Sequence, residues 1–360
     1  MKIAVITDYN NRTWIGKQNF QLYSSLKSIW IDVEIINLVS KQWFKNTPNY
    51  WINITSELFL FGSFFKFKRE LKKIFFSKQY THIIYWHQWL SYLYWLCNWL
   101  NITEIINCFD LFTLYPEYTP AYDPRFILYN LYFLRNIKKY KNIVFDSEFS
   151  RQDYWRFFTL EWKNTSVIHI WFNPWNTNKL SKINLNINLN WKKIILHVWS
   201  EDKRKNIETF YKIAEKYVSD KNILFIRVWN IKQANLDKIN SGGYSNVVYL
   251  NNLSEEELNW LYSVSDLFLF TSYHEWYWMP LVEAYSHSLP IVSSKVSDMA
   301  LIFKWDPNVH FVEDASDVNE YTTKINDILD NPKWFIKQKI FPILDSAWEA
   351  KEYLKFIEIC

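Results

Sequence analysis

The sequence predicts the α/β class, with two domains that are each built on a parallel sheet. Short apolar runs of strand length alternate with stretches of helical spacing along the whole chain. This alternation is typical of parallel sheets that are covered by helices on both faces. The alternation stops at an asparagine-rich segment, residues 173–191, and then starts again. A chain of 360 residues also exceeds what a single core usually supports, so two domains are the default expectation.

The interruption sets the expected domain boundaries. We expect an N-terminal Rossmann-like domain over 1–173, a linker over 174–191 and a C-terminal Rossmann-like domain over 192–342. A final helix over 343–360 is expected to pack back on the N-terminal domain. Two such domains that face a central cleft would bind ligands in that cleft, at the carboxyl ends of their strands.

The individual elements follow from the apolar runs and the amphipathic stretches between them. The expected strands are 2–8, 33–39, 81–86, 104–110, 142–147 and 167–171 in the first half, and 193–200, 223–229, 246–250, 267–272 and 290–294 in the second. Helical stretches lie between them, for instance 15–29 and 125–140.

Composition excludes several classes of protein. The net charge of +4 is near neutral for this length, which disfavours a dedicated nucleic-acid binder. Three cysteines without metal-ligand spacing are typical of a reducing compartment. The N-terminal run MKIAVITDYN is too short in its apolar part for a signal peptide, and no run of 18 apolar residues occurs. We therefore expect a soluble, cytoplasmic protein.

Glycine is scarce and tryptophan is abundant. The chain has four glycines and 21 tryptophans. Together they make up 25 of the 360 residues, or about 7%, which is the ordinary share of glycine alone.

Many tryptophans also stand where glycine is expected. Trp199 and Trp229 each follow an apolar run, Trp30 stands at the expected C-cap of a helix, and Trp14 lies beside Gly16. We hypothesise that many of these codons are UGA and that the source organism reads them as glycine. The alternative is a protein that is truly rich in tryptophan and binds carbohydrate by aromatic stacking.

One stretch carries the clearest chemistry, HEWYWMPLVEA at residues 274–284. Glu275 and Glu283 are eight residues apart, and Pro280 between them suits the first turn of a helix. With glycine at 276 and 278, successive backbone N–H groups would point at an anion or a sugar oxygen. The two carboxylates would accept hydrogen bonds from sugar hydroxyls.

Read with glycine, this stretch resembles the E-x7-E signature of retaining glycosyltransferase family 4, the glycosyl transferases group 1, which have the GT-B fold. ILHVWSEDKRKNI (195–207) resembles the block whose basic side chains hold the donor diphosphate, and this carries over to Arg204 and Lys205. The resemblance implies that Glu275 is catalytic and contacts the donor sugar, and that Glu283 binds the ribose. The other donor-binding residues that it implies are Trp14, Gly16, Trp276, Tyr277, Trp278, Met279, Pro280 and Leu281.

Further blocks follow in the order of the family. TWIG (13–16) resembles an N-terminal glycine pair in a strand-to-helix loop, and DSEFSRQD (146–153) resembles a block of the acceptor domain. IHIWFNP (168–174) resembles the block at the interdomain linker, with Asn173 in place of an aspartate. The blocks PEY (116–118), SEFSR (147–151) and RKN (204–206) resemble those of mannosyltransferase-like relatives.

One block departs from the family. EIINCFDLF (104–112) is similar to a strand end that commonly carries His-Asp. Here Phe109 takes the place of the histidine, while Asp110 remains as a second candidate catalytic residue. His87, at the end of another expected strand, is the nearest alternative polar group, although a histidine in such a place is more often structural.

The resemblance implies a hexosyltransferase that moves a sugar from a nucleotide-diphosphate donor to a glycan or lipid-linked acceptor, with retention of configuration. The N-terminal domain would bind the acceptor and the C-terminal domain the nucleotide sugar. No D-x-D pattern occurs, so neither a metal nor another cofactor is implied. Two alternatives stay open, namely a catalytically silent nucleotide-sugar-binding partner subunit and a GT-B nucleotide-sugar epimerase.

A basic and aromatic segment, FFKFKRELKKIFFSKQY (64–80), has helical spacing. It fits a helix that rests on an anionic membrane surface, which would make the protein peripheral on the inner face of the membrane. It fits an ordinary solvated helix equally well.

Overall fold

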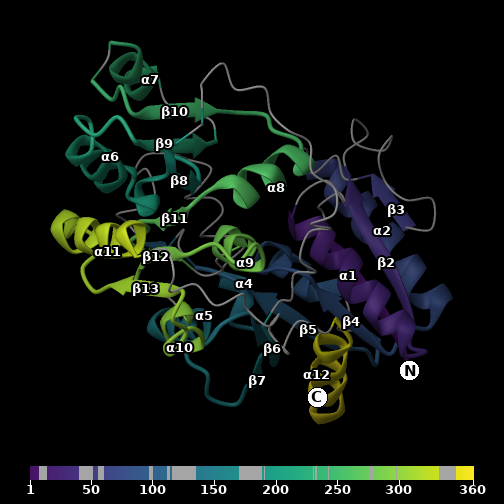
Figure 1. The fold of residues 1–360 in the computed structure, drawn as a ribbon. Coiled ribbons are helices and arrows are strands. Elements are labelled where there is room, and N and C mark those ends of the chain that lie inside the picture. The colour runs from purple at the N-terminus through teal and green to yellow at the C-terminus, as the bar shows by residue number, and fades with distance from the viewer. Residues whose placement is uncertain are drawn as a thin grey trace. The chain divides into compact units, whose positions relative to one another are not determined.

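The computed structural model divides the chain into two compact units, shown in Figure 1. The first contains Met1–Phe172 together with Pro342–Cys360, and the second contains Asn173–Phe341. The structure describes residues 1–7, 14–39, 52–55, 61–96, 100–111, 114–115, 135–169, 189, 191–229, 231, 233–241, 243–275, 279–296, 298–331 and 346–360.

The first unit is built on a seven-stranded sheet in the order β3-β2-β1-β4-β5-β6-β7, in which every pair is parallel. Its strands are β1 (Lys2–Thr7), β2 (Asp32–Val39), β3 (Ile52–Thr55), β4 (His82–Tyr85), β5 (Thr103–Cys108), β6 (Asn142–Phe145) and β7 (Asn164–Val167). The central strands are apolar because both faces of the sheet are covered. Ile3 and Val5 face one side, Ala4 and Ile6 face the other, and all four are fully buried.

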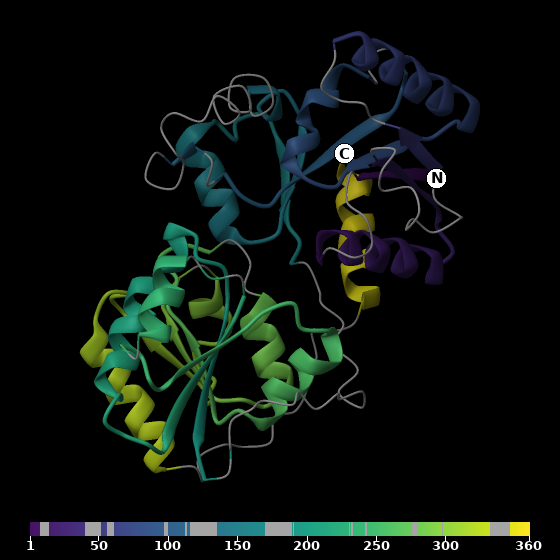
Figure 2. The same ribbon diagram turned by 90° about the horizontal axis from the view of Figure 1, so that it is seen from above.

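Helices cover the first sheet. They are α1 (Trp14–Ser28), α2 (Phe61–Lys78), η2 (Gln88–Leu96), α4 (Arg135–Ile137), α5 (Glu148–Phe157) and α12 (Ser346–Ile359). The C-terminal helix α12 belongs to this unit and contacts α1, beside which it lies in Figure 2. The ring of Tyr353 on α12 stacks on the fully buried Trp86.

The second unit repeats the design with a six-stranded parallel sheet in the order β10-β9-β8-β11-β12-β13. The strands are β8 (Lys193–Val198), β9 (Ile223–Val228), β10 (Val247–Leu250), β11 (Leu267–Phe270), β12 (Ile291–Ser294) and β13 (Val309–Val312). Its helices are η5 (Lys203–Lys205), α6 (Ile207–Lys216), α7 (Gln233–Asn240), α8 (Glu255–Val264), α9 (Met279–Ser286), α10 (Met299–Ile302) and α11 (Val318–Asp330).

Both sheets have the doubly wound strand order of Rossmann-like domains, so the predicted α/β class is confirmed. Two local expectations were wrong, and two strands were missed. The strand expected at 167–171 is β7, which ends at Val167, and β3 and β13 were not predicted. The expected loop TWIG contains the start of α1 at Trp14. A helix start also leaves its first N–H groups without partners inside the helix, so the backbone there still offers donors.

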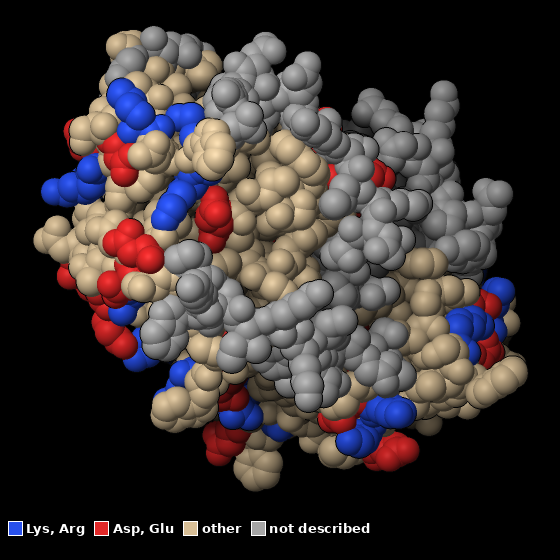
Figure 3. Space-filling view, in the orientation of Figure 1, with Lys and Arg blue, Asp and Glu red and all other residues tan. Residues whose placement is uncertain are grey.

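Charges of both signs lie on the face that Figure 3 shows. Figure 3 shows Lys and Arg interspersed with Asp and Glu over the described part of one face, in keeping with the net charge of +4. Within the described residues, no helix is both long enough and apolar enough to cross a bilayer.

Candidate functional site

The candidate site lies in the second unit, in the loops that follow β8 and β11. These two strands are neighbours in the sheet although they are not consecutive in the chain, so the strand order reverses between them. In open α/β sheets, ligands bind at such a reversal, just outside the carboxyl ends of the strands.

Glu275 is the centre of this site, and its side chain is fully buried. Lys205 Nζ donates to both of its carboxylate oxygens, at 2.7 and 2.8 Å. Arg204 donates to Oε2 at 2.9 Å, and the indole Nε1 of Trp199 donates to Oε1 at 3.0 Å. The three partners come from the loop after β8, whereas Glu275 comes from the loop after β11.

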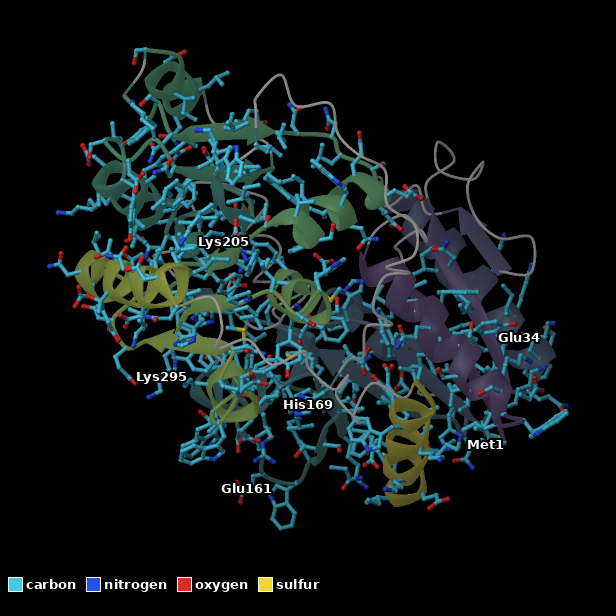
Figure 4. The ribbon with its side chains drawn as sticks, in the orientation of Figure 1. Met1, Glu34, Glu161, His169, Lys205 and Lys295 are labelled. Carbon is cyan, nitrogen blue, oxygen red and sulfur yellow. The ribbon has the colours of Figure 1, made fainter. Side chains whose placement is uncertain are left out.

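Lys205 is the buried cation of this cluster and is labelled in Figure 4. Burial lowers the pKa of Lys205 well below its usual value, and the negative charge of Glu275 acts in the opposite direction. The ammonium also lies 3.6 Å from the centroid of the Trp199 ring, within range of a cation–π contact. Arg204, whose side chain is 13% exposed, is the cation of the pair that reaches solvent.

Hydrogen bonds fix the two basic residues against the end of β11. The backbone N–H of Tyr273 donates to the carbonyl of Arg204 at 2.8 Å. The hydroxyl of Thr271 lies 3.3 Å from the carbonyls of Lys205 and Asn206. Asn206 adopts a left-handed conformation with φ of 51°, in which the chain turns into α6. The two cations are therefore held in place by backbone contacts as well as by Glu275.

Glu283 lies on α9 and does not join the cluster around Glu275. Its Oε2 accepts a hydrogen bond from the Tyr262 hydroxyl at 2.8 Å, and it is buried. Burial, and next the charge of Glu283, raise the pKa of Tyr262. Three donor-loop residues of the prediction begin the same helix and are buried, namely Met279, Pro280 and Leu281. Trp276, Tyr277 and Trp278 lie outside the described residues.

The other predicted residues belong to the first unit. Trp14 and Gly16 fall in the first turn of α1, and the side chain of Trp14 is outside the described part of the structure. Asp110 follows β5 and is buried. His87 follows β4 and is buried as well.

Phe109, which stands where the family commonly has histidine, is part of the core. It is 3% exposed and packs edge-on against Trp86, with 5.9 Å between the ring centroids. Its backbone N–H donates to Gln88 Oε1 at 3.1 Å, and its carbonyl accepts from Ser150 at 2.5 Å. The side chain at this position therefore serves packing.

Some residues of the site were missed from the sequence. Thr271 contacts the carbonyl of Lys205, and Tyr262 donates to Glu283. In both pairs the two residues are far apart in the sequence, so a local motif does not link them. For Thr271 a signal did exist, because it is a polar residue at the carboxyl end of an apolar strand, where ligand sites of α/β sheets form. For Tyr262, one of many tyrosines in a helical stretch, no local pattern distinguishes it.

A comparison with protein families finds a match in the second unit. Residues 184–340 match the family model of the glycosyl transferases group 1. Comparison with curated protein sequences gave no match.

Solved structures match over the whole chain. HepE (Alr3699) of Anabaena, in complex with UDP and glucose, is 13% identical with a TM-score of 0.71, and 100% of each chain is covered. Sucrose-phosphate synthase of Thermosynechococcus elongatus is 16% identical with a TM-score of 0.67, covering 99% of this chain and 94% of the other. The UDP-GlcNAc 2-epimerase of Methanocaldococcus jannaschii is 11% identical with a TM-score of 0.60, with 100% of both chains covered. The two-unit α/β architecture is therefore the GT-B fold.

Proposed function

We propose that this protein is a glycosyltransferase that moves a hexose from a nucleotide-diphosphate sugar to a glycan or lipid-linked acceptor, with retention of configuration. The observation that carries the proposal is the cluster of Arg204, Lys205 and Glu275 at the strand-order reversal of the second unit. Two cations and a buried carboxylate in this place suit a ligand that has both a diphosphate and sugar hydroxyls.

In the proposed reaction, Arg204 and Lys205 turn from Glu275 to the diphosphate of the donor. Glu275 then accepts hydrogen bonds from hydroxyls of the transferred sugar, and Glu283 from the ribose. The acceptor oxygen bonds to the anomeric carbon while the bond from that carbon to the phosphate oxygen breaks. The acceptor proton passes to the departing phosphate, and the two cations stabilise the charge that develops there. Asp110 and the loops after β8 and β11 also position the reacting groups, which lowers the barrier further.

The test is a panel of UDP- and GDP-sugars, with released nucleoside diphosphate as the readout and NMR of the anomeric proton for stereochemistry. We expect turnover with one donor, retention in the product, and no loss on adding EDTA, because no metal is proposed. Glu275→Gln should lower turnover at least tenfold, as expected when an interaction with the reacting sugar is weakened. Turnover with inversion, or with none of the donors, would overturn the proposal.

Phe109 favours a second candidate, a catalytically silent subunit that binds nucleotide sugar for an active partner. Its side chain is packed on Trp86 and offers no polar group. Binding of a nucleotide sugar without hydrolysis or transfer would support this candidate. Epimerisation of a free UDP-sugar would instead support the third candidate, a nucleotide-sugar epimerase.

We also propose that many of the tryptophans are glycine in the native protein. Among the residues that the structure describes, four tryptophans have positive φ, namely Trp30, Trp162, Trp191 and Trp229, with values of 65°, 64°, 66° and 155°. Positive φ favours glycine and disfavours bulky residues. Trp30, Trp162 and Trp191 are also at least 88% exposed, so packing does not explain their size.

The same substitution would open the candidate site. Glycine at 199 would remove the indole that donates to Glu275 and lies over Lys205, and so would leave room for a ligand. The test is the mass of the 274–295 peptide from natively sourced protein. A mass lower by two Trp-to-Gly differences supports the proposal, and a mass that matches two tryptophans contradicts it.

We propose further that α2 rests on the inner, cytoplasmic face of an anionic membrane, where a lipid-linked acceptor would be found. From residue 69 onward this helix exposes Arg69, Lys72 and Lys73, and Phe76 beside them is 77% exposed. Basic side chains with an exposed aromatic ring suit an anionic bilayer surface.

We expect the protein to sediment with phosphatidylglycerol vesicles but not with phosphatidylcholine vesicles. The double variant Lys72→Glu/Lys73→Glu should abolish this sedimentation. Equal sedimentation of that variant would contradict the proposal, and Lys212→Glu on the second unit serves as the control.

A further inference from the structure

Arg227 is a fully buried arginine on β9, in the second unit. It stands in the run ILFIRV, in which all six residues are buried. Burying a guanidinium is costly unless its charge is paired and its N–H groups find acceptors. The groups that pair with Arg227 therefore indicate which role this buried arginine has.

One charge partner and one hydrogen-bond acceptor of Arg227 lie in the loop after β8, residues 199–206. NH1 of Arg227 forms an ion pair with Glu201 Oε1 at 3.2 Å, and both side chains are shielded from solvent. NH2 donates to the backbone carbonyl of Trp199 at 3.3 Å. Asn235 on α7 donates to the same Glu201 oxygen at 3.0 Å. One guanidinium thus holds the first and third residues of the loop.

The backbone of residue 199 is fixed from both sides. Its N–H donates to the carbonyl of Val228 at 3.2 Å, while its carbonyl accepts from Arg227. Both contacts involve backbone atoms, so they are the same whether residue 199 is tryptophan or glycine. Glycine would make them more important, because it leaves the backbone more conformations to choose from.

The far end of the same loop carries Arg204 and Lys205, whose carbonyls are held by Tyr273 and Thr271 at the end of β11. The loop is therefore fixed at its start by β9 and at its end by the β11 loop. A binding loop held at both ends loses little freedom when it binds a ligand, and this favours affinity.

We infer that Arg227 and Glu201 are positioning residues, which hold the 199–206 loop in the conformation that presents Arg204 and Lys205 to a nucleoside diphosphate. This inference rests on the proposed function. It predicts that removing the pair weakens nucleotide binding even though neither residue touches the ligand. Replacing residues that orient metal ligands commonly changes metal affinity by about 10- to 100-fold, and we expect an effect of the same order here.

The experiment titrates UDP and GDP into the full-length protein and its variants by calorimetry, with the melting temperature of each variant measured alongside. Arg227→Met and Glu201→Gln are expected to raise the Kd about tenfold. Arg227→Lys keeps the charge, but a single ammonium cannot span both acceptors, so a smaller rise in Kd is expected. This conservative variant also keeps the inference testable if Arg227→Met does not fold.

A charge-swapped variant separates positioning from mere stability. Glu201→Arg/Arg227→Glu restores an ion pair, but a carboxylate at 227 has no proton to donate to the carbonyl of residue 199. We expect its melting temperature to recover towards that of the wild type while its Kd stays about tenfold raised. Asn246→Ala is the matched control, since Asn246 is buried at the opposite end of the sheet and donates to Ala214 at 2.8 Å. It should lower the melting temperature and leave the Kd unchanged.

The outcomes are distinguishable. The first outcome is that the wild type binds UDP or GDP and that the Kd of each variant rises only as far as its melting temperature falls. If, in addition, both the Kd and the melting temperature of the charge-swapped variant return to the wild-type values, Arg227 and Glu201 are structural only. The inference is then overturned. If the wild type binds neither nucleotide, the proposed function fails and this inference fails with it. If the charge-swapped variant has a raised Kd but a recovered melting temperature, the result supports both the proposed function and the positioning role of Arg227 and Glu201.

Discussion

At the scale of single residues, backbone conformation and side-chain size disagree at several tryptophans. Trp30 and Trp191 have φ of 65° and 66° and expose 95% and 94% of their surface. A left-handed conformation costs a residue with a Cβ roughly 1–2 kcal/mol. The low glycine count was visible in the sequence, and it pointed to Trp30 and Trp229. Trp162 and Trp191 were not singled out, because each of them stands just before a strand and not after one.

We predict that Trp191→Gly stabilises the protein that carries tryptophan there. Relief of the left-handed conformation should outweigh the greater chain entropy of glycine, for a net gain of about 0.5–1 kcal/mol. Urea unfolding measures it. Trp191→Ala should gain less, because alanine keeps a Cβ.

Trp305→Gly is the second control, since Trp305 is 87% exposed and is not among the residues with positive φ. Equal gains at 191 and 305 would show that surface hydrophobicity, and not φ, explains the effect.

The buried Lys205–Glu275 pair gives a second prediction at this scale. Lys205→Met leaves the Glu275 carboxylate buried with fewer donors, so we expect a loss of about 3–5 kcal/mol of unfolding free energy. The double variant Lys205→Met/Glu275→Gln should recover part of this loss, since it removes the uncompensated charge. A double-mutant cycle measured by denaturant unfolding gives the coupling.

Lys212→Met is the matched control for this cycle. Lys212 is an exposed lysine of α6 in an i,i+4 pair with Glu208. Pairs of that kind contribute only a few tenths of a kcal/mol. A coupling between Lys205 and Glu275 no larger than this would contradict the buried pair.

At the scale of elements, the sequence predicted the central strands well and the edge strands poorly. β1, β8, β9 and β11 are largely apolar because they are covered on both faces. β7 at the edge of its sheet reads NTSV, and all four of its residues are half-buried. Such a strand lacks the apolar run by which a strand is recognised. The unpredicted β3 and β13 are edge strands too.

The site shows the same limit. Local motifs predicted Arg204, Lys205, Glu275 and Glu283 as site residues, and the structure brings the first three of them together. Arg227 was missed because an arginine within an apolar run is recognised as a buried partner only when Glu201, from another loop, is placed beside it.

Helix α8 offers a prediction about an element. Its N-terminus has a capping box, in which Glu257 N–H donates to Ser254 Oγ at 3.2 Å and Ser254 N–H donates to the Glu257 carboxylate at 2.7 Å. Ser254→Ala should lower the unfolding free energy by about 1 kcal/mol. Ser263→Ala is the control, because the hydroxyl of Ser263 donates to the carbonyl of Trp260 within the same helix and caps no helix end. A cost at 263 equal to that at 254 would contradict the capping role.

At the scale of the whole molecule, the second unit should be sensitive to acid. Burial, and next the charge of Arg227, hold the pKa of His197 well below its usual value, with Lys205 acting in the same direction. The unfolded histidine titrates near pH 6.5. Below that pH the unfolded state binds a proton that the folded state does not, so stability present above pH 6.5 is lost as the pH falls.

His197→Gln should remove this part of the acid sensitivity. Unfolding free energies measured from pH 7.5 to 5 should fall less steeply for the variant, by up to about 1.4 kcal/mol per pH unit. Other buried histidines contribute to the total slope, so the difference between the two proteins is the relevant quantity. Identical slopes would contradict the burial of a neutral His197.

The central claim is that a nucleoside diphosphate binds in the second unit, at the loops after β8 and β11. Hydrogen–deuterium exchange of the full-length protein, with and without saturating UDP or GDP, tests it most directly. The account predicts slower exchange in peptides spanning residues 199–206 and 271–284, and unchanged exchange in the sheet of the first unit. Protection confined to other segments, or no protection with either nucleotide, would contradict it.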